Sequence, residues 1–219
     1  MWTVTKFPLC RGHVIPQVPD LASVSCDSDA ALRPALGFVG AGGGVRLTVT
    51  GLEATRAALR ELEGQPFTAI GRAATLVWLT FGDDVSWVDH HGEHTVRPEM
   101  SLHLQCRWRL LNGVSAMVQE GDLYVPGARA GAGFEAGGDI GTSRFDDRVE
   151  TVTQLIAADA PVVDHVRIGD EFDLQLMLSS GMFLEVFPAG RPEWEDWRFL
   201  SSGEERSHYV VENGSVFKA

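Results

Sequence analysis

Cysteine is scarce in this sequence. Its 219 residues include only Cys10, Cys26 and Cys106, and none of them belongs to a Cys-x-x-Cys pair. An odd number of unpaired cysteines argues against a disulfide framework and predicts a reducing, cytoplasmic location. No run of about 18 apolar residues occurs, so we expect no membrane-spanning helix. The N-terminus lacks a charged start followed by an apolar core, so we expect no signal peptide.

Clusters of basic residues are absent as well. The chain has 18 Lys and Arg against 30 Asp and Glu, and its formal net charge is -12. A surface of this charge repels phosphate groups, so neither nucleic acid nor an anionic membrane is an expected partner. A basic protein is the easier partner to attract, although an acidic surface also serves simply to keep a protein in solution.

Motifs that identify common cofactor and catalytic sites are missing. The glycine run at 40–44 has no P-loop or dinucleotide-binding pattern around it, and we expect no cofactor. No Gly-x-Ser-x-Gly occurs, and no His-Glu-x-x-His occurs either. Catalysis by a familiar serine or zinc centre is therefore not predicted.

The apolar pattern that is present predicts an α+β fold of antiparallel sheets with packed helices. Leucines recur at helical spacing in Gly51–Glu63, and strands are predicted on either side of it. The stretch Leu102–Leu111 alternates between apolar and polar residues and is predicted as one strand, with Val114–Val118 as its hairpin partner. Asp146–Ala158 is predicted as a second helix, and because of its β-branched residues a strand is the alternative. The remaining predicted strands are Pro66–Arg72, Thr75–Phe81, Val162–Ile168, Phe172–Leu178, Met182–Phe187, Trp197–Phe199 and His208–Val211.

A similar order of elements occurs twice, which favours two related halves in tandem, although short apolar strands also resemble each other by chance. The predicted organisation is an irregular N-terminal segment 1–46, a first α+β half 47–126, a mobile Gly-rich linker 127–145 and a second half 146–219.

Two Trp-Arg pairs are predicted to be structural. Trp108 and Trp197 fall on apolar strand phases, so we expect both rings in the core, with Arg109 and Arg198 bonded to carboxylates or carbonyls.

The densest group of titratable residues lies at 89–94, within a polar loop that is predicted from Trp87 to Pro98. His90, His91, His94 and the later His103 could together hold a metal ion. The rival interpretation is a loop of solvated histidines, because Gly92 and its turn-forming neighbours disfavour the helix that would align them.

Acids and tryptophans alternate just before the second Trp-Arg pair. Strand alternation places Trp194 and Asp196 on one side, and Glu193, Glu195 and Trp197 on the other. An exposed Trp194 beside Glu193, Glu195 and Asp196 would suit a protein-binding surface. Pairing of Glu195 with a nearby arginine and acid-base catalysis by two of the carboxylates are the alternatives.

The sequence resembles a group of uncharacterised bacterial proteins over roughly residues 60 to 214. The shared motifs are Gly71-Arg72-Ala73, Leu-His-x-Gln-Cys-x-Trp-Arg at 102–109, Asp-x-Tyr-x-Pro at 122–126, Leu-Glu-Val-Phe-Pro at 184–188 and Glu-x-Trp-Arg-Phe at 195–199. The resemblance implies no established activity, and by weak analogy it suggests a small immunity or accessory protein.

These observations favour a non-enzymatic protein, of immunity or accessory type, that binds a basic protein partner. The alternative is a metal-dependent or hydrolytic enzyme that uses the histidine group.

Overall fold

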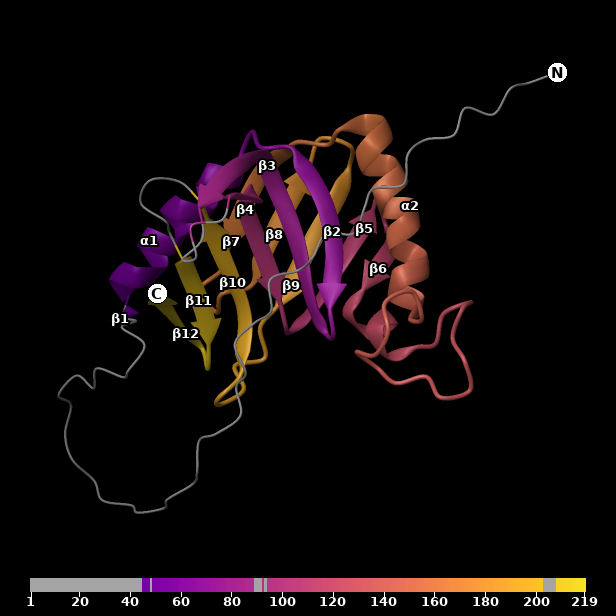
Figure 1. Cartoon of the computed structure of the whole chain (residues 1–219). Helices are drawn as coiled ribbons and strands as arrows, with labels where there is room; N and C mark the ends of the chain where they lie inside the picture. The colour runs from indigo at the N-terminus through magenta and orange to yellow at the C-terminus, as the bar shows by residue number, and fades with distance from the viewer. Residues whose placement is uncertain (1–44, 48, 89–91, 93, 203–207) are drawn as a thin grey trace, which may run out of the picture. The chain divides into compact units, whose positions relative to one another are not determined.

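Two antiparallel β-sheets face each other across one apolar core (Figure 1). The computed structural model describes residues 45–47, 49–88, 92, 94–202 and 208–219, with side chains from Gly51 onward. All of these residues belong to one unit, Phe38–Ala219, so the predicted irregular segment 1–46 lies outside the described residues except for its last two.

The larger sheet has seven strands, in the order β1 (Val45–Leu47), β12 (Ser215–Lys218), β11 (His208–Glu212), β10 (Glu195–Ser201), β4 (His94–Leu104), β3 (Leu76–Val88) and β2 (Phe67–Ala73). The smaller sheet has five, in the order β6 (Ser115–Gln119), β5 (Arg107–Asn112), β9 (Met182–Phe187), β8 (Leu174–Leu178) and β7 (Val163–Ile168). The predicted α+β class is therefore confirmed.

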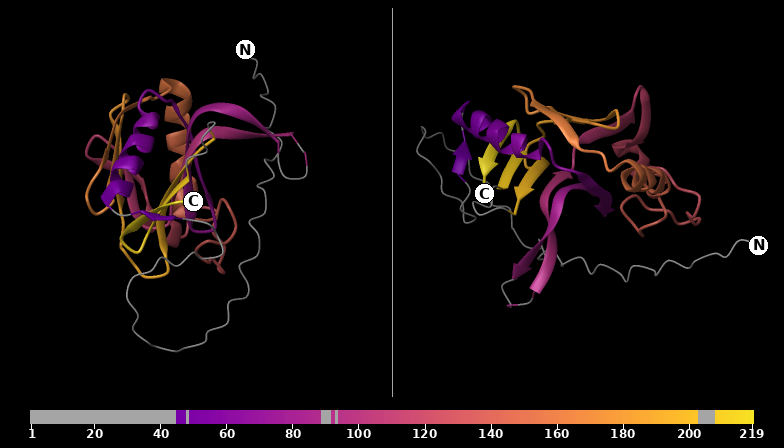
Figure 2. Two further views of the ribbon diagram at one scale, coloured as in Figure 1. Left: turned by 90° about the vertical axis from the view of Figure 1, so that its left-hand side faces the viewer. Right: turned by 90° about the horizontal axis from the view of Figure 1, so that it is seen from above.

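Two helices flank the smaller sheet on the same side of the larger one (Figure 2). Helix α1 (Val49–Leu59) continues into the 3₁₀ turn η1 (Arg60–Leu62) and packs against β12 and β7. Leu59 and Leu62 are fully buried, and Gly64 ends the turn at φ +87°, a conformation that glycine adopts without strain.

Helix α2 (Arg144–Asp159) packs against β2, β6 and the 3₁₀ turn η2 (Glu120–Tyr124). Ser143 begins α2 with a reciprocal cap: its hydroxyl accepts from the Asp146 amide at 3.3 Å, and the Asp146 carboxylate accepts from the Ser143 amide at 2.9 Å. Both predicted helices are thus present.

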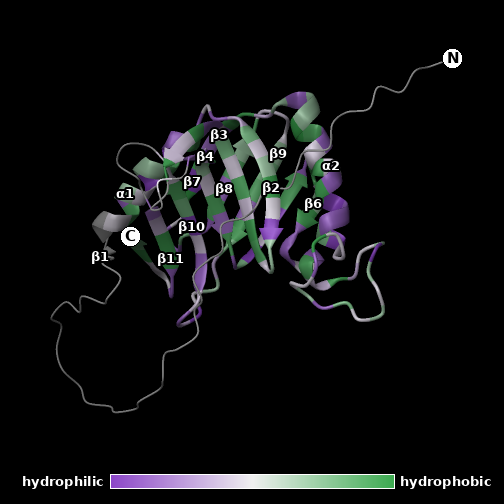
Figure 3. Ribbon diagram, in the orientation of Figure 1, coloured by the Kyte–Doolittle hydropathy of each residue, from purple (hydrophilic) through white to green (hydrophobic). Residues whose placement is uncertain are grey.

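The core is formed by the side chains that the strands of the two sheets direct towards each other. Trp108 of the smaller sheet packs edge-on against Phe145 of α2, with ring centroids 6.1 Å apart. Trp197 of the larger sheet is fully buried, and its indole N–H donates to the Phe172 carbonyl at 2.9 Å. Figure 3 shows apolar residues along the strands of both sheets.

The prediction of a single strand over Leu102–Leu111 is wrong. The chain leaves the larger sheet after Leu104 and enters the smaller sheet at Arg107. The amides of Gln105 and Cys106 both donate to the Asp196 carbonyl, at 2.8 and 3.1 Å. Both sheets direct their apolar faces to the same core, so apolar and polar residues continue to alternate across the change of sheet. The sequence pattern therefore does not reveal the crossing.

The predicted loop at 87–98 is mostly strand. β3 runs on to Val88 and β4 starts at His94, so the two strands form a long hairpin. Beyond Glu99 this hairpin has no other strand beside it, and the views in Figure 2 show it bending away from the sheet. We call this part, Asp84–Val88 with His94–Pro98, the β-arm.

Both sheets draw strands from both predicted halves. The larger sheet takes β2–β4 from the first half and β10–β12 from the second, and the smaller sheet takes β5 and β6 from the first half and β7–β9 from the second. The structure therefore does not show a tandem repeat, and the Gly-rich stretch 127–145 does not divide one sheet from the other. No helix among the described residues has the length and apolar character that crossing a bilayer requires.

Candidate functional site

The outward face of the larger sheet is the main candidate surface. The described helices and the smaller sheet all lie on the opposite side (Figure 2). Cross-strand pairing places one row of side chains across this face: Gly71, Trp78, His103, Arg198, Val210 and Phe217. A second row contains Thr80, Ser101, Leu200 and His208. We call these two rows the outer face.

Trp78 and Gly71 determine how the outer face is shaped near β2. A Cβ added to Gly71 would lie 2.3 Å from the Trp78 ring, so the indole lies directly over the glycine. The missing side chain in β2 therefore provides the space that the Trp78 ring occupies.

A β-bulge sets the phase of β10. Glu195 pairs with Glu212 and Trp197 with Val211, so Asp196 is the extra residue between them. The bulge places Glu195 and Arg198 on the same face, where the Arg198 guanidinium donates to both oxygens of Glu195, at 2.6 Å from Nε. Trp197 points into the core.

Asp196 is not an exposed binding residue, contrary to the sequence expectation. It is 2% exposed, and its carboxylate accepts from the amides of Ala189 and Gly190 at 2.8 and 3.1 Å. The expected alternation from 193 to 197 is also wrong, because the bulge inserts a residue that strand periodicity does not count. Glu195 pairs with Arg198, which agrees with the alternative that Glu195 bonds to a nearby arginine.

Trp194 is exposed as expected, with 61% of its surface accessible, but it lies in the turn before β10 and not in a strand. The Arg191 guanidinium lies 5.7 Å from its ring centroid. Glu193 is also exposed and has a positive φ of 63°. Of the four expected binding residues, Trp194 and Glu193 are thus exposed, Glu195 is partly buried on the outer face, and Asp196 is buried.

The first Trp-Arg pair belongs to the smaller sheet. Trp108 is 1% exposed, and Arg109 forms an ion pair with Glu185 on β9. It therefore lies in a different sheet from Trp197 and Arg198, and the two pairs do not form one site.

The histidine group is not assembled by the described residues. His90 and His91 lie outside them, and His94 is exposed on the β-arm. Nine residues of strand, roughly 30 Å, separate His94 from His103. No group of three or more His, Cys, Asp or Glu side chains suited to a metal ion occurs among the described residues.

His103 instead lies beside Arg198 on the outer face. Burial, followed by the Arg198 charge, lowers the pKa of His103 to about 4. The pKa of His208 is lowered by the same two causes. Both imidazoles are therefore neutral at pH 7, and a general base of such low pKa would be a weak one.

Sequence reasoning missed the apolar members of the outer face, namely Trp78, Leu200, Val210 and Phe217. The sequence contained a signal in the adjacent apolar residues Phe199-Leu200 and Val210-Val211. Adjacent residues of a strand point to opposite faces, so β10 and β11 each have apolar side chains on both faces. A strand that is apolar on both phases contacts apolar surface on both faces.

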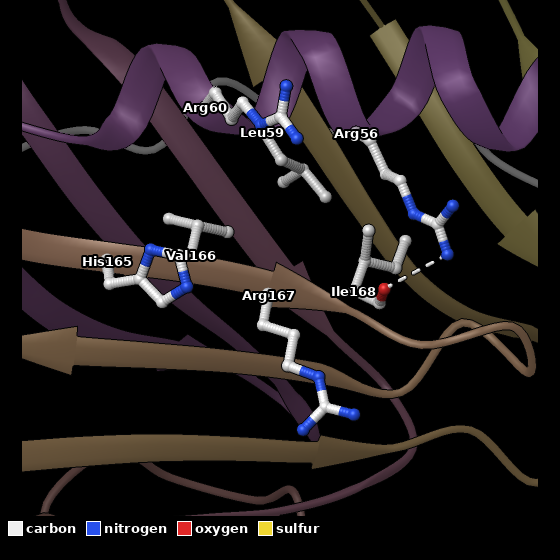
Figure 4. Close-up of a pocket in the computed structure, with 7 residues that line it drawn as sticks. All are labelled: Arg56, Leu59, Arg60, His165, Val166, Arg167 and Ile168. Carbon is white, nitrogen blue, oxygen red and sulfur yellow. Dashed lines mark hydrogen bonds between the residues drawn. The ribbon is translucent and has the colours of Figure 1, made fainter.

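A hollow of about 210 Å³ lies between α1 and the edge strand β7 (Figure 4). The Arg56 guanidinium donates to the Ile168 carbonyl at 3.4 Å, and the Glu63 carboxylate accepts from the Val166 amide at 3.0 Å. These side chains bond the open edge of β7 and so hinder pairing with another chain. Figure 4 shows Arg167 extending away from the helix, so the arginines do not converge on a ligand.

Comparisons of the chain with protein-family models, curated proteins and solved structures found no match.

Proposed function

We propose that the protein binds another protein, one with a basic and partly apolar surface, through its outer face. The observation that carries the proposal is the composition of this face. Trp78, Leu200 and Val210 lie on the side of the sheet opposite to the described helices and the smaller sheet. The solvent side of an antiparallel sheet is ordinarily polar, so large apolar side chains on it, placed around the polar centre of His103 and Arg198, support a binding surface.

The charges on this face favour a basic partner. Glu195 and Glu212 are directly opposite each other on β10 and β11, and like charges in that position repel. Arg198 supplies one positive charge for the two acids, so a cationic side chain of the partner would neutralise the other. The first 37 residues contain three basic and three acidic residues, so the whole net charge of -12 falls on Phe38–Ala219. This charge would speed the encounter.

An immunity-type or accessory role in a bacterial cytoplasm remains part of this proposal, supported by the resemblance and by Cys106, a buried free thiol. An enzymatic role has less support. His94 and His103 lie at opposite ends of β4, and burial lowers the pKa of His103 to about 4, which makes it a weak proton acceptor at pH 7.

Photo-crosslinking in the native cell tests the proposal. A photoreactive amino acid in place of Val210 would label the partner, whereas the same group at Val114, fully exposed on the β5–β6 hairpin, is the matched control. We expect an adduct with one basic protein from position 210 and none from 114, and the yield should fall as salt rises.

A charge reversal sharpens this test. Glu212→Arg should reduce the adduct, whereas Glu171→Arg, with the same change in net charge but in the β7–β8 turn, should not. Equal labelling from both positions would contradict the proposal. So would a crosslink to a second copy of the chain, or to the chain's own first 44 residues.

A further inference from the structure

The outward face of the smaller sheet is a second open surface, on the opposite side of the molecule from the outer face. Figure 2 shows no described helix or strand lying over this side of the smaller sheet. Cross-strand pairing places one row of side chains on it: Ala116, Leu111, Phe183, Met177 and His165. Met177 is 51% exposed, and Leu111 and Phe183 are half-buried. Most of this row is therefore apolar and accessible.

Arginine is the main charged residue on the same face. The next row contains Gln119, Arg109, Glu185, Gln175 and Arg167, and beyond it Arg107 pairs with Phe187. We call these three rows the rear face. Its three arginines share it with one carboxylate, that of Glu185, and the five strands contain one further acid, Asp164, at a bulge in β7. The rear face is therefore basic, although the whole chain has a net charge of -12.

The guanidinium groups of the rear face have donors to spare. Within the described part of the chain, Arg107 forms no ion pair, and its guanidinium lies 4.8 Å from the centroid of the Phe187 ring. Glu185 accepts from Nε of Arg109, which leaves the two terminal nitrogens of Arg109 without a described acceptor. A guanidinium stacked on an aromatic ring keeps the N–H groups at its edge free to bind a carboxylate.

Strand β5 sets the spacing of these groups. Leu111, Arg109 and Arg107 follow one another on its outward side, about 7 Å apart, because every second residue of a strand points the same way. An extended segment of another chain has the same spacing. An apolar residue in such a segment, with acids at the second and fourth positions after it, would match the three side chains in order.

The apolar row favours a protein segment over a phosphate-rich partner. A nucleic acid or an anionic membrane surface would be repelled by the net charge of -12. Phosphate groups would also leave Leu111, Phe183 and Met177 without an apolar contact. A segment that carries both carboxylates and an apolar side chain satisfies both kinds of row.

We propose that the rear face binds an extended acidic segment of another protein. One apolar side chain of the segment contacts Leu111 and Phe183, and its two carboxylates pair with Arg109 and Arg107. The rear face and the outer face have no residue in common. The protein would thus hold a basic partner on one side and an acidic partner on the other.

A capped peptide, Phe-Ser-Glu-Ser-Glu, is the probe, and methionine methyl groups labelled with ¹³C report on it. The Met177 methyl resonance should shift saturably on titration, whereas that of Met100, buried in the larger sheet, should not move. Phe-Ser-Lys-Ser-Lys should leave Met177 unshifted. Phe-Glu-Glu-Ser-Ser has the same composition as the probe, but its adjacent acids point to opposite sides, so it should bind at least about threefold more weakly.

Two variants separate the rear face from general attraction to arginine. Arg107→Gln should weaken binding of the acidic peptide about threefold or more, as expected for one exposed ion pair. Arg97→Gln is the matched control and should leave binding unchanged, because Arg97 is equally exposed and lies 4.7 Å from the centroid of the Trp87 ring, but on the β-arm. Melting curves would show that both variants fold.

Several outcomes would overturn the proposal. These are no saturable shift of Met177, equal binding of the lysine peptide, or unchanged binding in Arg107→Gln. A larger Met177 shift with oligothymidylate or with phosphatidylglycerol vesicles would assign the face to a phosphate-rich partner instead. A Met177 resonance that moves with protein concentration alone would assign it to a second copy of the chain. Crosslinking from position 210 tests the outer face separately, so failure of one proposal is distinguishable from failure of the other.

Discussion

Glu195 and Arg198 form an ion pair on one face of β10 because Asp196, between them, is the extra residue of a β-bulge. Without the bulge, residues three apart on a strand would point to opposite faces. The same residue holds the crossing of the chain between the sheets, since its carbonyl accepts from the amides of Gln105 and Cys106. One local irregularity thus fixes the core position of Trp197, the polar centre of the outer face and the junction of the two sheets.

Replacing Asp196 by Ala should therefore destabilise the protein strongly. The substitution leaves the amides of Ala189 and Gly190 without their acceptor, and each lost hydrogen bond to a charged group is worth about 1.5–3 kcal/mol. Urea unfolding should show a loss of roughly 3–5 kcal/mol. Asp164→Ala, an exposed site on β7, is the control and should change little. If Asp196→Ala were as stable as this control, the bulge would not depend on the carboxylate.

Substitutions of Trp108, Trp197 and Trp194 by Ala should differ sharply in their effect on stability. Trp108→Ala and Trp197→Ala each leave a large cavity in the core and should lower the free energy of unfolding by about 3–5 kcal/mol. Trp194→Ala removes an exposed ring and should leave the melting temperature nearly unchanged. Thermal unfolding followed by circular dichroism measures all three. An unchanged midpoint in both core variants would contradict the packing described here.

Periodicity predicts most of the secondary structure because one face of each strand contacts the core. The helix at 51–63, the helix at 146–158 and the strands β6, β7, β8 and β9 of the smaller sheet are found close to their predicted bounds. Periodicity also predicts the buried Trp108 and Trp197. These features depend on local patterns of apolar residues, which a single sequence contains.

The features that the sequence did not reveal depend on contacts distant along the chain. The crossing at Gln105–Cys106 is fixed by Asp196, some ninety residues later, and leaves the alternation intact. Each sheet contains strands from both predicted halves, and the pattern of apolar residues within a strand does not specify which strand it pairs with. The outer face likewise arises only when β3, β4, β10 and β11 lie side by side.

The buried ion pair between Arg72 and Asp146 is one such distant contact, and breaking it should be costly. The Arg72 guanidinium donates to both Asp146 oxygens at 2.8 Å, and their side chains are 2% and 8% exposed. Asp146→Asn leaves Arg72 charged and buried without its counter-ion, so we expect a loss of about 3–5 kcal/mol in urea unfolding. Asp147→Asn, the next residue on α2, is the control. If the two variants were equally stable, hydration of Arg72 would compensate for the loss of its ion pair with Asp146.

Acid should weaken the fold through the same carboxylate. Burial alone would raise the pKa of Asp146, but hydrogen bonds from Arg72 and Ser143 outweigh it and lower the pKa well below its usual range. A carboxyl group with a lowered pKa stabilises the folded state above its ordinary pKa, near 3.8, and this contribution is lost as pH falls below that value. The dependence of stability on pH between about 5 and 2 should therefore be flatter in Asp146→Asn than in the wild type.

His103 should produce a separate loss of stability at higher pH. The pKa of His103 is about 4 in the folded protein, against 6.5 ordinarily. Between these two pH values the imidazole is protonated in the unfolded chain and neutral in the folded chain. Stability should be highest above pH 6.5 and should fall as pH decreases from 6.5 to about 4. Thermal unfolding of His103→Gln across this range should show a smaller fall. His94→Gln, an exposed histidine on the β-arm, should follow the wild type. A parallel fall in His103→Gln would show that His103 does not cause it.

Gly71→Ala offers a way to change the outer face while leaving the apolar core untouched. The new methyl group would come within 2.3 Å of the Trp78 ring, so the indole must move away from β2. The backbone at Gly71 does not have a positive φ, so alanine is not strained there, and stability should fall by about 1–3 kcal/mol as in other overpacked sites. The displaced ring should alter the near-ultraviolet circular dichroism and reduce crosslinking from position 210. Gly121→Ala, where a Cβ meets open space, is the control. Unchanged crosslinking despite a displaced Trp78 would remove that ring from the proposed binding surface.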